Sequence, residues 1–225
     1  MSPTGQLTTI AEVIACMEQI DATLPRKDGV AYFNRLYLAV TNAVQTASAA
    51  TTFKNPLFLT RLDVVFAGMY FDAEATLASG APCPVAWRPL METRSENVAP
   101  IQFALAGMNA HINHDLALAL VQACQDLGLA IDDQHADFES VNGILQDFEA
   151  QVAGWFETGL IADIEDVIPK DVDRALAMWS IVAAREVAWG NAQMLWRFRG
   201  DRLLYSGYAD VVARTTELAG RAMLV

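Results

Sequence analysis

The chain has 225 residues, of which 53% are hydrophobic and 19% are charged, and this composition excludes a disordered protein because it can bury a sizeable core. Asp and Glu number 27 against 15 Lys and Arg, and the resulting formal charge of -12 argues against nucleic acid or an anionic membrane as partner, since both select clustered positive charge. No apolar run approaches the roughly 20 residues of a membrane span, no signal peptide is evident, and the three cysteines form no C-x-x-C pair. We therefore expect a soluble, cytoplasmic protein with reduced thiols.

Helical periodicity dominates the first part of the chain. An amphipathic helix is expected to begin near residues 8–9, and a second helix follows Asp28 as its N-cap. Asn55-Pro56 supplies both an N-cap and a first-turn proline for a third helix, which is apolar on almost every face. A helix that is hydrophobic all round is a central one, so we expect Asp63 to lie in the interior, most simply paired with an arginine.

The periodicity fails between Ser79 and Pro100, where prolines recur. This segment is too long for a neutral connector. It is expected to be either a lid over a functional site or a packed loop anchored by Trp87.

The second half of the chain again predicts helices. Pro100 opens a fourth, central helix that continues to Leu127. Asp137 is a candidate cap for a fifth helix, and Asp171 or Asp173 for a sixth. A weaker amphipathic helix is expected over 201–225.

These elements predict one fold class. No run of alternating β-branched residues bounded by turn signals indicates a sheet. We expect a single all-α domain over residues 1–225, a bundle of about seven helices with the third, fourth and sixth most buried.

The central helix carries the strongest candidate site. At 100° per residue, Asp115 lies about 40° from His111 and His114 about 60° on the other side, so all three project toward one sector. Gly107 shares this sector and is expected to leave room beside the imidazole of His111. Asn109 and Asn113 point to the opposite side, where we expect them to fix neighbouring elements.

Three interpretations of this cluster remain open. His111 and Asp115 have a spacing that can chelate a divalent metal such as zinc or iron. His114 or a residue from another helix, with Glu186 among the candidates, would complete the shell. Alternatively, Asp115 orients an imidazole that acts as general acid or base. In the third interpretation, the histidines belong to a buried polar network and bond to Asp63, Arg185, Glu186 or backbone carbonyls.

Arg185 on the sixth helix is the second candidate. Trp189 and Trp196 lie within about 40° of it on the helical wheel, so we expect its guanidinium to be flanked by indoles. It is expected either to bind a substrate carboxylate in forked geometry or to pair with Asp63 or Glu186.

Two resemblances bear on these motifs. His111–Leu116 is similar to the His-x-x-x-Asp segment of the zinc phospholipase C and P1 nuclease family, although His114 replaces the usual glycine and the later Pro-x-His element is missing. The segments 28–37, 61–72 and 100–116, with the central NAHINHDL motif, resemble an actinobacterial family known as a domain of unknown function. That resemblance implies a bacterial protein, often found near metabolic or natural-product genes, and it brings no established catalytic residues.

The sequence thus predicts a small-molecule enzyme with its pocket inside the bundle. His111, His114 and Asp115 would transfer protons or hold a metal, while Asp63 and Arg185 would orient the site. The substrate is expected to be compact and largely apolar, with one or two oxygens. The alternative is a non-catalytic protein that binds such a ligand, or a structural helical protein.

Overall fold

The computed structural model describes residues 7–48, 53–158 and 180–225, and all regular secondary structure in these ranges is helical. The α-helices are α1 (Ile10–Thr23), α2 (Gly29–Ser48), α3 (Pro56–Ser79), α4 (Arg88–Thr93), α5 (Pro100–Ala110), α6 (Leu116–Leu127), α7 (His135–Thr158), α9 (Ile181–Phe198) and α10 (Arg202–Met223). Two short 3-10 helices, η2 (Val85–Trp87) and η4 (Asp132–Gln134), and a π-helical turn, η3 (His111–Asp115), complete the list. The predicted all-helical bundle is confirmed. Within the described ranges, no helix combines the length and apolar character needed to cross a membrane.

Local sequence signals set most helix ends. Thr9 begins α1 with a capping box, accepting from the backbone N–H of Glu12 while the Glu12 carboxylate accepts from the backbone N–H of Thr9. Asn55 caps α3 by accepting from the Phe58 backbone N–H at 3.2 Å. Gly128, with φ of 65°, ends α6 in the left-handed conformation that glycine adopts without strain.

The predicted start of the fifth helix is wrong, because α7 begins at His135 rather than after Asp137. Asp137 is 4% exposed, and its carboxylate accepts backbone N–H groups of Lys54 at 2.8 Å and Asn55 at 2.6 Å. It therefore anchors the chain entering α3 instead of capping its own helix. The predicted start of the sixth helix at Asp171 or Asp173 lies outside the described residues, and the described part of α9 follows Ser180 as its N-cap.

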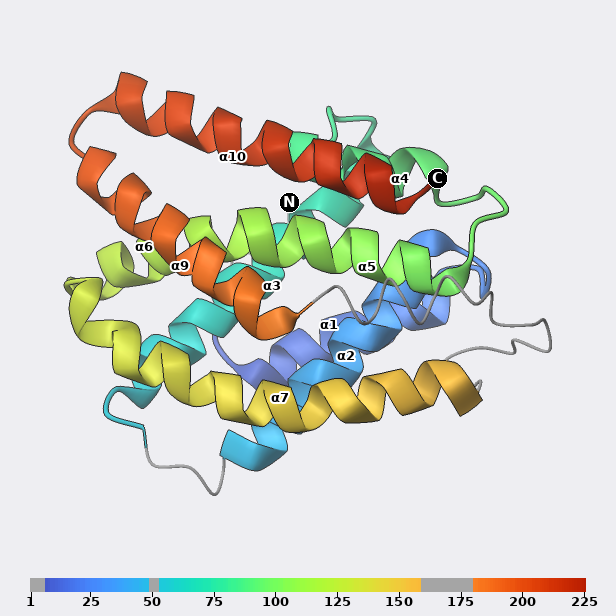
Figure 1. Cartoon of the computed structure of the whole chain (residues 1–225), viewed down its shortest axis with the longest axis horizontal. Coiled ribbons are helices and arrows are strands. Elements are labelled where there is room, and N and C mark those ends of the chain that lie inside the picture. Colours follow the sequence, from blue (N-terminus) through green and yellow to red (C-terminus); the bar gives the residue numbers. More distant parts are fainter. Residues whose placement is uncertain (1–6, 49–52, 159–179) are drawn as a thin grey trace.

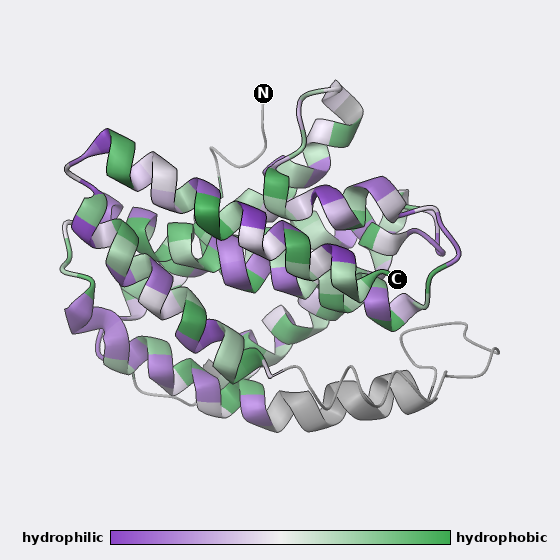
Figure 2. Ribbon diagram, turned by 45° about the horizontal axis from the view of Figure 1, so that its top comes forward, coloured by the Kyte–Doolittle hydropathy of each residue, from purple (hydrophilic) through white to green (hydrophobic). Residues whose placement is uncertain are grey.

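The α5, η3 and α6 elements form one continuous rod through the bundle (Figure 1). Its α5 part packs against α2 and α10, and its α6 part packs against α3 and α9. α9 and α10 run antiparallel, joined by a short turn. Figure 2 shows hydrophilic and hydrophobic residues side by side on the outer helices, as expected for amphipathic helices around a common core. Every residue of α5 from Phe103 to Ala110 is buried, which confirms the central position predicted for this helix.

Burial of two other helices differs from the prediction. α9 was expected to be among the most buried, yet Val187 on its outer face is 57% exposed. The first half of α2 is more enclosed, with Val30, Phe33 and Asn34 fully buried. α2 contacts α1, α4, α5 and α7, and these four neighbours account for its burial.

Candidate functional site

The predicted cluster lies on a π-helical turn in the middle of the central rod. The Leu116 backbone N–H donates to the His111 carbonyl, a five-residue step that widens the helix between α5 and α6. Within this turn His111 is 1% and Asp115 2% exposed. π-Helical turns of this kind are frequent at functional sites.

Asp115 accepts hydrogen bonds from three side chains. Its Oδ2 accepts from Trp87 Nε1 at 2.9 Å and lies 3.1 Å from His111 Nδ1, while its Oδ1 lies 2.7 Å from His114 Nδ1. Burial by itself would raise the pKa of Asp115, but the hydrogen bonds from His111 and His114 outweigh it and lower that pKa. The carboxylate is therefore ionised at neutral pH. His111, His114 and Asp115 come together as predicted, and Trp87 is the contact that sequence analysis did not assign.

The geometry fixes the tautomer of His111. An ionised carboxylate only accepts hydrogen bonds, so Nδ1 of a neutral His111 carries the proton and Nε2 carries the lone pair. Burial lowers the pKa of His111, even though Asp115 acts in the opposite direction. The ring stacks on Phe66 with centroids 3.5 Å apart and meets the edge of Tyr37 at 4.5 Å, which accounts for that burial.

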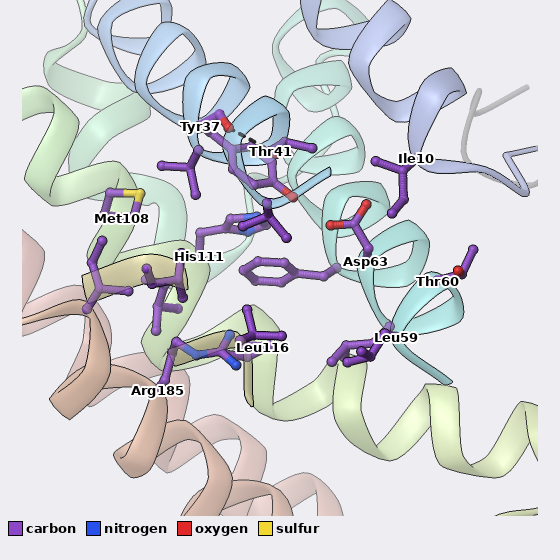
Figure 3. A pocket seen from close by; sticks show the side chains of 18 of the residues that line it. Ile10, Tyr37, Thr41, Leu59, Thr60, Asp63, Met108, His111, Leu116 and Arg185 are labelled. Atoms are coloured by element: carbon purple, nitrogen blue, oxygen red, sulfur yellow. Dashed lines mark hydrogen bonds between the residues drawn. The ribbon is translucent and has the colours of Figure 1, made fainter. Parts of the chain in front are cut away.

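A cavity of about 250 Å³ adjoins this cluster (Figure 3). Aliphatic and aromatic side chains supply most of its wall, among them Val40, Leu62, Phe66, Ile112, Leu116 and Ile181. They come from helices that are distant in sequence. The cavity is therefore a product of the tertiary fold.

Three polar atoms of this cavity have no hydrogen-bond partner. Among the described residues, the buried side-chain nitrogen and oxygen atoms without a partner are Tyr37 Oη, Asp63 Oδ2 and His111 Nε2. All three residues line the same cavity. Figure 3 shows their side chains directed into one part of it. An unpartnered buried polar atom costs about 1–3 kcal/mol, so three in one place mark a polar site in an otherwise apolar wall that water or another bound molecule can complete.

Asp63 is not paired with an arginine as predicted. Part of the side chain stays accessible, but Oδ2 is enclosed and unpartnered. Burial raises the pKa of Asp63 from 3.8 to about 7. Burial, followed by the nearby charge of Asp63, raises the pKa of Tyr37 well above 10, so the phenol stays protonated.

Arg185 lines the cavity, but its environment differs from the predicted one. The guanidinium lies 4.0 Å from the centre of the Phe138 ring, while Nε donates to Asn142 Oδ1 at 2.7 Å and Nη2 donates to the Phe138 carbonyl at 2.8 Å. The ring that faces the Arg185 guanidinium is Phe138 rather than a predicted indole, and the guanidinium above the Trp196 ring belongs to Arg199. Burial lowers the pKa of Arg185 to about 10, so it remains charged at neutral pH.

The three residues predicted as metal ligands are not assembled. Glu186 is exposed and accepts from Asn142 Nδ2 at 3.2 Å, whereas His111 and Asp115 bond to each other inside the bundle. Across the residues that the structure describes, no group of three or more His, Cys, Asp or Glu side chains is placed to hold a metal ion. Both carboxylate oxygens of Asp115 are instead occupied by hydrogen-bond donors, Trp87 and the two histidines.

Gly107 and Asn109 lie on the same helix as His111, and the structure corrects the expected role of Gly107 and confirms that of Asn109. Gly107 makes room for the Phe33 ring rather than directly for the imidazole, since a Cβ at this position would lie 2.4 Å from that ring. Phe33 in turn meets His111 edge-on at 5.8 Å. Asn109 donates to the Thr216 carbonyl at 2.9 Å, which confirms that it fixes a neighbouring helix, here α10.

The proline-rich segment between residues 79 and 100 does not line the cavity. It contains η2 and α4, and its Trp87 is fully buried at Asp115. The prediction of a lid over this cavity is wrong. The prediction of a segment anchored by Trp87 is confirmed.

The chain matches one known protein family over most of its length. The model of DUF5995, described as a family of unknown function, matches residues 10–225. The chain belongs to this family. No curated protein and no solved structure matches it. Every residue of the cavity described above lies within the matched DUF5995 region, so the site is part of the family domain.

Proposed function

We propose that this DUF5995 protein is a small-molecule enzyme in which His111 is a general base. The observation that carries the proposal is the Nε2 lone pair of a neutral, buried imidazole, which has no partner and belongs to a cavity-lining residue. A base in this position is placed to accept a proton from a molecule bound in the cavity.

The groups behind His111 suit this role. Asp115 holds Nδ1–H at 3.1 Å and keeps Nε2 free. When His111 accepts a proton, the ionised Asp115 stabilises the imidazolium that forms. Trp87 and His114 hold Asp115 in place with one hydrogen bond to each oxygen.

The cavity limits the substrate. A dry cavity of 150 Å³ holds benzene, so about 250 Å³ corresponds to roughly ten non-hydrogen atoms. Most of the wall is apolar, and the unpartnered polar atoms come from Tyr37, Asp63 and His111. The substrate is thus compact, largely apolar, and polar at one end.

The second candidate is a protein that binds such a ligand without converting it. The same unpartnered atoms favour it, because they recognise polar groups whether or not a proton moves. Arg185 also contributes equally to both candidates, since two of its nitrogens are already bonded to Asn142 and Phe138 and support the wall of the cavity.

One experiment separates the candidates. Compact aromatic and alicyclic compounds are tested for an increase in Tm, and the stabilising ones are followed by mass spectrometry for consumption. We expect consumption by the native protein and none by His111→Asn. His135→Asn, the same change at a half-exposed histidine outside the cavity, is the matched control. Stabilisation by many compounds with consumption of none identifies a binding protein instead.

A further inference from the structure

We propose that Tyr37 and Asp63 form a pair of hydrogen-bond donors for a carbonyl oxygen. The substrate class that follows is a compact ketone or related carbonyl compound with an acidic C–H bond next to the carbonyl. This inference rests on the proposed role of His111 as base and assigns the groups that face it.

The two donors come from neighbouring parts of the cavity wall. Tyr37 lies on α2 and Asp63 on α3, and Figure 3 shows both side chains directed toward the part of the cavity that His111 borders. The Thr41 hydroxyl lies close enough to Tyr37 Oη to lower the pKa of the phenol, but it donates to the Tyr37 backbone carbonyl at 2.9 Å. Neither Tyr37 Oη nor Asp63 Oδ2 therefore has a well-formed hydrogen bond, and the two do not bond to each other. Each can therefore bond to one ligand atom between them.

The protonation states make both groups donors. Burial raises the pKa of Asp63 to about 7, so below that pH the carboxylic acid carries a proton. The pKa of Tyr37 is raised well above 10, first by burial and then by the charge of Asp63. Two neutral O–H donors in an apolar wall suit an oxygen that gains negative charge during a reaction.

The third unpartnered atom, His111 Nε2, is an acceptor and completes the chemistry. His111 removes a proton from the carbon next to the carbonyl, and the electron pair of that C–H bond forms a carbon–carbon double bond. The π electrons of the carbonyl move to its oxygen, which becomes the enolate oxygen held by Tyr37 and Asp63. The proton then returns from His111 to the same carbon or to a conjugated one, so the reaction is exchange, epimerisation or isomerisation and needs no oxidant or co-reactant.

The surroundings strengthen the donor bonds. Phe66 and Leu62 make this part of the wall apolar, and hydrogen bonds to a charged oxygen are stronger where the local dielectric is low. Arg185 does not compete for the oxygen, because its Nε and Nη2 already donate to Asn142 and to the Phe138 carbonyl.

The donor pair is tested with 4-nitrophenol, a planar probe with ten non-hydrogen atoms whose absorption spectrum distinguishes phenol from phenolate. Its phenolate oxygen resembles the enolate oxygen. At a pH below the pKa of free 4-nitrophenol, we expect the protein to bind the probe as phenolate. A purely apolar cavity binds the neutral phenol, and this outcome overturns the proposal. Preferred binding of benzylamine, a cation, also overturns it, because Asp63 would then act as a carboxylate.

Variants assign the effect to the two donors. Tyr37→Phe and Asp63→Ala should each weaken phenolate binding about ten- to a hundredfold, the range expected for a hydrogen bond to a charged group. Asp63→Asn keeps an N–H donor and should rescue binding. It should also remove the loss of affinity that the native protein shows above about pH 7, where Asp63 ionises. Tyr205→Phe, at a half-buried tyrosine outside the cavity, is the matched control. Equal phenolate binding by all of these variants contradicts the donor pair.

A second measurement separates this inference from the role of His111. In D2O, exchange of the C–H groups next to the carbonyl of 2-indanone is followed by NMR. We expect the native protein to accelerate exchange and His111→Asn to reduce it to the solvent rate. Phenolate binding that needs Tyr37 and Asp63, without exchange that needs His111, supports the donor pair and overturns the base. Consumption or exchange that needs His111, with the probe bound as neutral phenol, supports the base and overturns the donor pair.

Discussion

Asp63→Asn is expected to stabilise the protein above neutral pH. The enclosed Oδ2 of Asp63 has no partner, so the charged carboxylate is costly to bury whereas an amide of the same shape is not charged. Carrying the pKa of this group from 3.8 to about 7 corresponds to a loss of up to about 4 kcal/mol of unfolding free energy at about pH 8. In a chain of this length, that difference is roughly 8–16 °C in Tm.

The direction of this pH dependence follows from the number of protons that the folded and unfolded states bind. Between about pH 4 and pH 7 the folded state keeps the Asp63 proton and the unfolded state has lost it, so the stability of the native protein falls as pH rises through this window. Asp63→Asn lacks this decline. Urea unfolding followed by far-UV circular dichroism, from about pH 4 to about pH 8, measures both curves.

The result that would refute this reasoning is a pair of parallel curves. Equal pH dependence means that Asp63 is solvated or partnered in the folded protein. Asp210→Asn is the control, because Asp210 is exposed and pairs with Arg214 on the surface, where ion pairs contribute about 0–1 kcal/mol. It should shift the curve little at any pH in this window.

Further predictions concern the support of the site. Trp87→Phe removes a hydrogen-bond donor to the ionised Asp115 and should lower the free energy of unfolding by about 1.5–3 kcal/mol near neutral pH. The loss should be smaller below about pH 4, where Asp115 of the unfolded chain is protonated. Urea unfolding at both pH values measures the difference. Equal losses at both pH values would mean that packing, not the hydrogen bond, is at stake. Gly107→Ala places a Cβ 2.4 Å from the Phe33 ring and should lower the free energy of unfolding by about 1–3 kcal/mol. Gly190→Ala, with no atom within 4 Å of the new Cβ, should raise it by about 0.5–1 kcal/mol. Thermal melts measure both effects. Similar effects of the two substitutions would contradict the close packing at Gly107.

The unpartnered atoms of the cavity contrast with the other buried polar groups of the bundle. Asn34 is fully buried, and its amide donates to the Met17 carbonyl while its oxygen accepts from Tyr70. Asp137 is equally well supplied by the backbone N–H groups at the start of α3. Because these two groups are fully partnered, the three unpartnered atoms at one cavity mark a polar site rather than a poorly packed core, and this supports the proposed ligand.

Much of the helical framework could be predicted from the sequence because its signals are local. Thr9, Asn55 and Gly128 each act within one helical turn, through a side-chain cap or a left-handed backbone. His111 and Asp115 could likewise be placed together, because they lie one turn apart on a helix that is apolar throughout.

The remaining parts of the site depend on contacts between distant segments, which the periodicity of one helix does not encode. Trp87 reaches Asp115 from a segment whose pattern indicated a loop, and Tyr37 and Asp63 arrive from two other helices. Asp63 gave a signal as a charged residue in an apolar helix, but only the packing of α3 against its neighbours leaves its Oδ2 without a partner. The sequence therefore determined which helix carries the imidazole and the carboxylate that orients it. The tertiary structure alone decided that Nε2 of this imidazole is free at a cavity, because burial and the absence of a partner are properties of the assembled bundle.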